Sequence, residues 1–161
     1  MPINRLKQFL DDRAIKYIVI SHSAAYTAQG IAALAHIPGK ELAKTVIFKI
    51  AGAFAMAVVP ASRQVDLALL RTAAHTNDVE LASEMEFKSK FPDCETGAMP
   101  PFGNLYEMVV FADETLSHDQ EIAFNAGSHR ELIRMAWGDF ERLVKPVVVR
   151  LATQRPVDTA A

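Results

Sequence analysis

The chain has 161 residues, half of which are hydrophobic, and carries a formal net charge of −2 at pH 7. That length is ordinary for one domain, and that composition supplies enough apolar side chains for a full core. The charge excludes a global basic surface that would hold nucleic acid by phosphate neutralisation alone, so an RNA partner would have to be held locally.

Cysteine content and the N-terminus indicate a cytoplasmic protein. The single cysteine, Cys94, cannot form an internal disulfide, which fits a reducing compartment. Residues 1–5 lack the layout of a signal peptide, and no apolar run reaches the roughly 20 residues that a membrane helix needs. We expect one domain over residues 1–152, without membrane contact, and a flexible tail over 153–161.

Apolar spacing, caps and breakers predict the elements of the first half of the chain. They are a helix capped by Asn4, a strand over 17–20, a helix over 27–35, and a hairpin whose strands cover 45–50 and 54–59. Both hairpin strands are continuous apolar runs, so we expect them to be buried on both faces of a sheet.

The second half of the chain contains more caps and shorter apolar runs. These predict a helix capped by Asp66, a helix opened by the capping box of 83–86, strands over 107–111, 122–125 and 132–136, a helix capped by Asp139, and a closing strand over 147–151. The hairpin and the irregular order of elements argue against a regular doubly wound fold. We predict a mixed α/β domain of the α+β type, with short helices around a largely antiparallel or mixed sheet.

The most informative stretch is residues 96–103, Thr-Gly-Ala-Met-Pro-Pro-Phe-Gly. Two glycines bracket an apolar loop with two prolines. Proline fixes φ and removes an N–H group, whereas glycine opens φ values that are closed to other residues. Such a segment keeps one backbone shape and lets another group approach closely, which suits a wall of a small pocket.

Lys44 and His129 are the candidate polar groups of that pocket. Lys44 stands at the head of an apolar run, where its ammonium group can bind a phosphate or a ribose hydroxyl; the alternative is a strand-end lysine in solvent. His129 follows Gly127 and Ser128 in a predicted turn and can act as acid, base or hydrogen-bond donor; the alternative is a surface histidine. His22 either lines the same cleft or caps the next helix.

The usual catalytic signatures are missing from the sequence. Cys94 has no matched histidine, and the neighbouring Asp93 and Glu95 would raise the pKa of its thiol. No nucleophile elbow, metal-ligand spacing, Walker motif or dinucleotide fingerprint is present. If the protein is an enzyme, we expect it to work without a protein nucleophile, metal or cofactor, through positioning and backbone hydrogen bonds.

Four segments, in this order, resemble the family of YbaK and the editing domains associated with prolyl-tRNA synthetase. The resemblance runs from about residue 17 to residue 151. Its carriers are Ala43-Lys44-Thr45-Val46, Val58-Val59-Pro60-Ala61 with Val65-Asp66-Leu67, the segment 97–103, and Asn125-Ala126-Gly127-Ser128-His129. Each segment alone is weak evidence for the family, whereas the four segments together, in this order, are fairly specific for it.

The resemblance implies a hydrolase that acts in trans on mischarged tRNA and cleaves the ester between the amino acid and the terminal adenosine. It implies that Lys44 holds the phosphate or sugar of the terminal nucleotide. It also implies that the backbone of 97–101 shapes the aminoacyl pocket and helps to place a water, and that His129 contacts the aminoacyl group or the tRNA end. Lys44, Gly97 and His129 are thus the candidate catalytic residues. The other residues expected to bind substrate are His22, Thr45, Met99, Pro100, Pro101, Phe102, Gly103, Gly127 and Ser128. The implied fold is a mixed sheet, curved nearly into a barrel, with helices outside.

Elementary chemistry agrees with this hypothesis. An aminoacyl ester is already activated, so a positioned water and backbone N–H groups near Lys44 and Thr45 would suffice for hydrolysis. The slightly negative net charge implies weak intrinsic affinity for tRNA, which a synthetase partner or reliance on the acceptor end would compensate. Two other hypotheses remain open: a non-catalytic module that binds a tRNA end or an aminoacyl or nucleotide ligand, and an unrelated small-molecule hydrolase.

Overall fold

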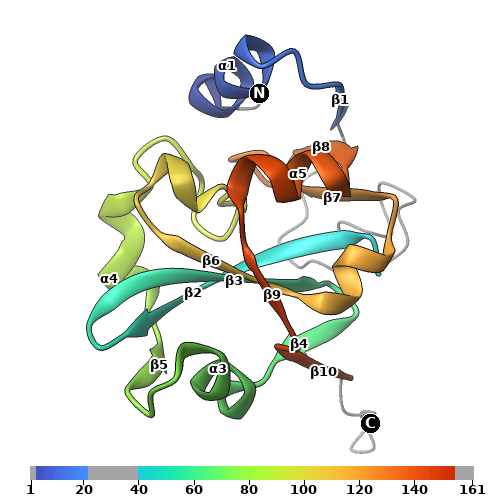
Figure 1. The fold of residues 1–161 in the computed structure, drawn as a ribbon. Coiled ribbons are helices and arrows are strands. Elements are labelled where there is room, and N and C mark those ends of the chain that lie inside the picture. Colours follow the sequence, from blue (N-terminus) through green and yellow to red (C-terminus); the bar gives the residue numbers. More distant parts are fainter. Residues whose placement is uncertain (1–2, 22–39, 155–161) are drawn as a thin grey trace, which may run out of the picture.

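The computed structural model describes residues 3–21 and 40–154, with short helices on both sides of a central sheet (Figure 1). Its helices are α1 (Asn4–Asp12), α3 (Leu67–Ala74), α4 (Glu84–Phe87) and α5 (Trp137–Val144), with 3₁₀ turns η1 (Lys88–Lys90), η2 (Gly103–Leu105) and η3 (Glu114–His118). Its strands are β1 (Tyr17–Ser21), β2 (Leu42–Ile50), β3 (Ala53–Pro60), β4 (Arg63–Val65), β5 (Val79–Leu81), β6 (Val109–Asp113), β7 (Glu121–Asn125), β8 (Glu131–Ala136), β9 (Val147–Val149) and β10 (Ala152–Gln154). The helix expected over 27–35 lies outside the described residues. None of the helices in the described ranges is long and apolar enough to cross a membrane.

The main sheet is mixed, as predicted. Its strand order is β1-β8-β7-β2-β3-β6-β9, and β5 pairs with the far end of β2. The pairs β7–β2, β3–β6 and β6–β9 are parallel, whereas the other pairs are antiparallel. β4 and β10 form a separate two-stranded ribbon. In the described part of the chain β1 and β9, the two ends of this order, do not pair, so the sheet is open there.

The β2–β3 hairpin forms as predicted, but its strands extend beyond the apolar runs. Ala51 (φ 50°) and Gly52 (φ 84°) make the two-residue turn, and two positive φ values are typical of the type I′ turns that suit hairpins. Lys44 pairs with Val59 and is the third residue of β2, whereas the sequence placed it just before the strand. The main chain of Lys44 is therefore fixed by the pairing of β2 with β3.

Two hydrophobic clusters lie on opposite faces of the central strands. Side chains alternate along a strand: on β3, Met56 and Val58 belong to the first cluster, whereas Ala57 and Val59 belong to the second. The first cluster includes α1, α5 and the chain between α4 and β6; the second includes α3 and the β4–β10 ribbon. Figure 1 shows α3 and this ribbon on the lower side of the central strands, and α1 and α5 on the upper side.

Two of the predicted helix caps are confirmed and two are wrong. The Asp66 carboxylate accepts a hydrogen bond from the first turn of α3, and Ser83 opens the capping box of α4. Asn4 and Asp139 lie inside the first turns of α1 and α5, and the residues before these helices make no side-chain hydrogen bond. β8 runs directly into α5, which leaves no connecting residue to act as a polar cap.

The closing strand is interrupted because a buried carboxylate binds the chain there. Asp113, at the end of β6, accepts hydrogen bonds from Leu151 N–H at 2.8 Å and from Ala152 N–H at 3.0 Å. The predicted strand over 147–151 therefore ends at Val149 as β9, and β10 begins beyond it at Ala152. Thr153 and Gln154, which we expected in the flexible tail, pair with β4.

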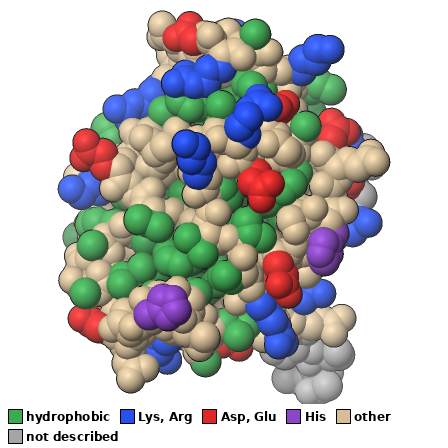
Figure 2. All heavy atoms as spheres, in the orientation of Figure 1, with side chains coloured by type: hydrophobic (Ala, Val, Ile, Leu, Met, Phe, Trp, Pro, Cys, Tyr) green, Lys and Arg blue, Asp and Glu red, His purple; other side chains and the backbone are tan. Residues whose placement is uncertain are grey.

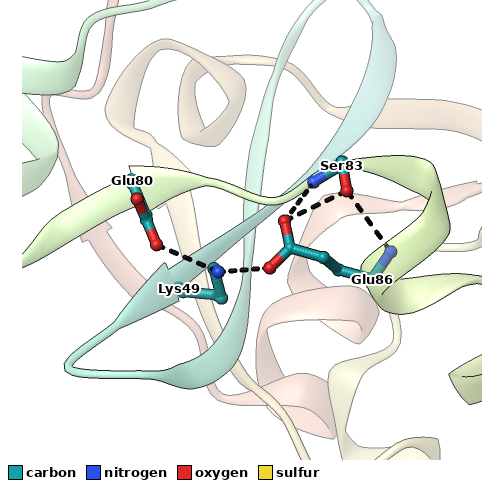
Figure 3. A network of polar contacts seen from close by, with 4 residues as sticks. All are labelled: Lys49, Glu80, Ser83 and Glu86. Atoms are coloured by element: carbon teal, nitrogen blue, oxygen red, sulfur yellow. Dashed lines mark hydrogen bonds and ion pairs between the residues drawn. The ribbon is translucent and has the colours of Figure 1, made fainter.

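A polar network fixes α4 against the hairpin (Figure 3). Lys49 of β2 binds the carboxylates of Glu80 and Glu86, and Glu86 also accepts a hydrogen bond from Ser83 N–H at 2.9 Å. The bond from Lys49, followed by those from Ser83, lowers the pKa of Glu86 to about 2. This network anchors the start of the segment that leads through η1 to the proline-rich loop.

Candidate functional site

The loop that follows η1 and the turn between β7 and β8 are joined by main-chain hydrogen bonds. Glu95 N–H donates to Gly127 O at 2.8 Å, and Gly127 N–H donates to Ala98 O at 3.0 Å. We call these two segments the 95–98 loop and the 126–129 turn. Both belong to the segments that the sequence singled out, and the fold places them in direct contact.

Two glycines allow the 95–98 loop and the 126–129 turn to pack tightly. Gly97 and Gly127 have φ values of +86° and +99°, which side-chain-bearing residues rarely adopt. A Cβ atom on Gly97 would lie 3.4 Å from His129 Cε1, and one on Gly127 would overlap the side chain of Ile3. The groups that approach these glycines closely are therefore side chains of the protein itself.

His129 is the last residue of the 126–129 turn. It is buried, with 6 % of its surface exposed, and its side chain contacts the 95–98 loop. Its Nε2 atom lies 2.7 Å from Thr96 O, and Nε2 is the donor because a carbonyl oxygen only accepts. Its main-chain N–H donates to Glu95 Oε2 at 3.2 Å. The alternative of a surface histidine is thus wrong. The contact of Glu95 with His129 was not predicted, because a single carboxylate belongs to no sequence motif.

Most of the proline-rich segment lies in the core. The residues that are buried are Ala98, Met99, Pro100, Pro101, Phe102 and Gly103. A Cβ atom on Gly103 would overlap Met108 O, so this glycine is required by close packing against the backbone. Thr96 and Gly97 are the exposed part of the segment. The buried part therefore fixes the shape of the loop, and direct access from solvent is restricted to its first two residues.

Lys44 lies beside the end of β7. The parallel pairing of β2 and β7 ends with Ala43 opposite Phe124, so the next residues in register, Lys44 and Asn125, lie level with each other. Asn125 immediately precedes the 126–129 turn. Lys44 is half-buried, so the alternative of a lysine wholly in solvent does not hold.

The edge of β2 has a gap in its strand pairing at Thr45. In the described ranges, β7 covers this edge as far as Ala43, and β5 covers it from Phe48 onward. The carbonyl oxygens of Glu41 and Ile47 accept hydrogen bonds along this edge, at 3.0 and 3.1 Å. Main-chain groups point to the same edge at every second residue, so the N–H and C=O groups of Thr45 point into the gap.

Lys44 and the proline-rich loop lie on opposite faces of the sheet. Lys44 projects on the face of the second cluster, like its partner Val59, whereas Met99 packs in the first cluster on the opposite face. A continuous sheet would separate the lysine from the proline-rich loop. At Thr45 no strand of the described ranges pairs with this edge of β2, so the separation by paired strands is interrupted there.

The structure thus brings part of the predicted site together. Four residues lie in the joined loop and turn, and two lie one strand away on β2: Gly97, Gly127, Ser128 and His129, then Lys44 and Thr45. Ser128 is nearly buried, and its hydroxyl accepts a hydrogen bond from Arg130 N–H at 3.3 Å. His22 falls outside the described residues.

Cys94 has the chemistry of a buried thiol. Burial, the largest cause, raises the pKa of this thiol to about 11, and the Asp93 carboxylate adds to the effect against the opposing hydrogen bond from Tyr106. The group therefore stays protonated at neutral pH and is a poor nucleophile. A cavity of about 130 Å³ lies next to it, bounded in part by Thr96 and Met99. Among the described residues, no group of three or more His, Cys, Asp or Glu side chains is placed to hold a metal ion.

The surface charge is mixed on the face shown in Figure 2. Lys and Arg side chains are interspersed with Asp and Glu, and a hydrophobic area lies below the centre, above the exposed His side chain at the lower left. Val109 and Val147 are exposed hydrophobic residues of β6 and β9, 58 % and 42 % exposed. This face therefore offers no continuous basic field of the kind that binds nucleic acid nonspecifically.

Comparison with known proteins gives consistent results. A sequence model of the aminoacyl-tRNA editing domain matches residues 22–143. The multifunctional Ser/Thr-tRNA deacylase ProXp-y of Escherichia coli strain K12 is 27 % identical over 150 residues, which cover 90 % of this chain and 89 % of that protein. The crystal structure of hypothetical protein APE2540 superposes with a TM-score of 0.83 at 18 % identity, covering 93 % of this chain and 100 % of that one. The crystal structure of a candidate trans-editing enzyme for prolyl-tRNA synthetase superposes with a TM-score of 0.80 at 19 % identity, covering 94 % and 96 %.

Proposed function

The chain belongs to the aminoacyl-tRNA editing domain family, and from this premise we propose which substrates it takes and which residues carry the reaction. It is a trans-editing deacylase, a hydrolase that cleaves the ester bond between an amino acid and tRNA. The observation that carries this conclusion is the match of the family over residues 22–143. As substrates we propose tRNAs charged with serine or threonine, the amino acids named for the relative from Escherichia coli.

Lys44 is proposed to bind the phosphate or the ribose of the terminal adenosine. Its half-buried position on a rigid strand supports this role, because a compact cation at a fixed point can orient an anionic ligand. Its placement level with Asn125 puts it next to the 126–129 turn. Loss of this cation should therefore weaken both the binding and the orientation of the tRNA end.

The main-chain N–H of Thr45 is proposed to stabilise the oxyanion. In the hydrolysis a water oxygen attacks the ester carbonyl carbon, the bond from that carbon to the ribose oxygen breaks, and the ribose oxygen takes a proton. Negative charge develops on the former carbonyl oxygen, and the Thr45 N–H, which points into the gap between β7 and β5, can donate to it. One such donor contributes about 10²–10³ in kcat.

The 95–98 loop is proposed to form the wall of the aminoacyl site, and His129 is proposed to hold this wall in place. Thr96 and Gly97 are exposed, while the Nε2–H of the buried His129 donates to Thr96 O. A wall of backbone atoms rejects amino acids by size, which discriminates by only about 1–3 kcal/mol per methylene group. Such weak discrimination is enough for editing, because the synthetase has already selected once.

The partner of the protein is aminoacyl-tRNA, and we propose that contact is confined to its acceptor end. The net charge of −2 and the mixed charges on the face in Figure 2 support a local contact. A synthetase that delivers the mischarged tRNA would compensate for the resulting weak affinity. We expect the protein to act in the cytoplasm, where translation takes place.

A panel of correctly and incorrectly charged tRNAs tests this proposal. Wild-type protein should release serine or threonine well above the spontaneous rate, Lys44→Ala should abolish the release, and the exposed-lysine control Lys88→Ala should not. Thermal unfolding should be the same for all three proteins. Binding without any turnover would show a non-catalytic module instead, and turnover of simple esters without dependence on tRNA would show a small-molecule hydrolase.

A further inference from the structure

Asn125, the last residue of β7, carries a buried polar atom that lacks a donor. Its side-chain oxygen is shielded from solvent, and no group in the described ranges donates a hydrogen bond to it. Buried amide oxygens are nearly always paired, because leaving one unpaired opposes folding. An unpaired oxygen at a candidate active site is therefore a position where a bound ligand can supply the missing hydrogen-bond donor.

The register places this oxygen beside Lys44. Ala43 and Phe124 are opposite each other, and both side chains belong to the first cluster. Side chains alternate along each strand, so the next residues, Lys44 and Asn125, project together on the opposite face. Neighbouring strands are about 4.8 Å apart, which sets the separation of the two residues.

The cation of Lys44 and the acceptor of Asn125 define a ligand with complementary groups. Such a ligand must offer a negative or acceptor group to the lysine and a hydrogen-bond donor a few ångströms away. The aminoacylated adenosine has both: phosphate and ester oxygens on one side, and the ribose 2′-hydroxyl and the α-ammonium group on the other.

We infer that Asn125 is a substrate-binding residue, whose side-chain oxygen accepts a hydrogen bond from a donor of the aminoacyl-adenosine end. This assignment rests on the proposed function, because it takes the ligand of Lys44 to be the end of a charged tRNA. Asn125 thus differs from His129, whose donor group is already bound to Thr96.

The test combines activity with stability in the full chain. Asn125→Ala and the nearly isosteric Asn125→Leu should lower kcat/KM for seryl-tRNA by about tenfold to a hundredfold, the effect of one lost hydrogen bond to a charged or hydroxyl donor. Both variants should unfold at the same temperature as wild type or higher, since each removes an unpaired buried oxygen. The exposed Asn104→Ala serves as the matched control and should change neither quantity.

Three non-hydrolysable inhibitors then identify the donor. They are the 3′-amide analogue of seryl-adenosine, its 2′-deoxy form and its desamino form, in which hydrogen replaces the α-ammonium group. Asn125→Ala should weaken inhibition by the full analogue, and removal of the group that Asn125 binds should abolish the difference between wild type and variant.

Equal activity in wild type and both Asn125 variants would overturn the inference while leaving the deacylase function intact. A variant that loses activity and stability together would overturn it as well, because Asn125 would then be structural. A wild-type protein without deacylase activity would instead refute the proposed function.

Discussion

Substitution of His129 by Gln and by Phe separates positioning from acid–base chemistry. The imidazole Nε2 donates to Thr96 O at 2.7 Å and is nearly buried. A glutamine amide can place an N–H group close to the position of Nε2, whereas phenylalanine fills a similar volume but cannot donate. If His129 acts by holding the 95–98 loop, His129→Gln should retain activity and His129→Phe should not.

The magnitudes follow from the loss of the hydrogen bond between His129 Nε2 and Thr96 O. A neutral intramolecular bond contributes about 0.5–1.5 kcal/mol to stability. In a domain of this size each kcal/mol corresponds to about 2–4 °C, so His129→Phe should lower Tm by about 1–6 °C. Because a displaced loop misplaces the substrate, kcat/KM for seryl-tRNA should fall about tenfold or more in this variant and stay within about threefold in His129→Gln.

Single-turnover deacylation and thermal unfolding of the three proteins provide the measurement. The reasoning is refuted if His129→Gln loses as much activity as His129→Phe while its Tm stays near that of wild type. That result would mean that a property specific to the imidazole ring is required in the reaction itself.

Three further predictions concern the scaffold around the site. Gly103→Ala should destabilise the fold by about 1–3 kcal/mol in chemical denaturation, because its Cβ would overlap a main-chain carbonyl oxygen; Gly138→Ala in α5, where a Cβ meets nothing, should be neutral or stabilising by up to about 1 kcal/mol. Asp113→Ala should cost about 2–6 kcal/mol, since two buried N–H groups lose their acceptor, and Asp113→Asn should cost clearly less; equal losses would argue against the bonds as the cause. The pKa of Glu86 is depressed, so its ion pair with Lys49 should stabilise the fold above about pH 4.5 and be lost as the pH falls toward about 2. Unfolding of Lys49→Gln across this range should show a smaller pH dependence than wild type, and an unchanged dependence would contradict this origin.

The elements that sequence reasoning predicted well are those fixed by local interactions. The turn at Ala51 and Gly52 and the caps at Asp66 and Ser83 each depend on residues within a few positions of one another. Local patterns also produced wrong predictions. Asn4 is a residue type that often caps helices, but here it is the first residue of α1 itself. Such errors shift a boundary without changing the fold.

The features that make the candidate site depend on pairing between distant segments. Among the strands that the structure describes, the pairing of β2 with β7 and with β5 leaves the gap at Thr45. No periodicity in the sequence encodes which strands become neighbours, so neither the gap nor the position of Lys44 beside Asn125 was predictable. The burial of His129 likewise depends on the contact between the 95–98 loop and the 126–129 turn.

The most direct test of the central claim is the rate at which stoichiometric protein releases serine from seryl-tRNA in a single turnover. Wild type should exceed spontaneous hydrolysis by at least about a hundredfold, the contribution expected of one oxyanion donor in a positioned site, and Lys44→Ala should return to the spontaneous rate without a change in Tm. A Lys44→Ala protein that hydrolyses seryl-tRNA as fast as wild type would contradict the account, because the ester would then be held and cleaved without the cation at the gap in the sheet.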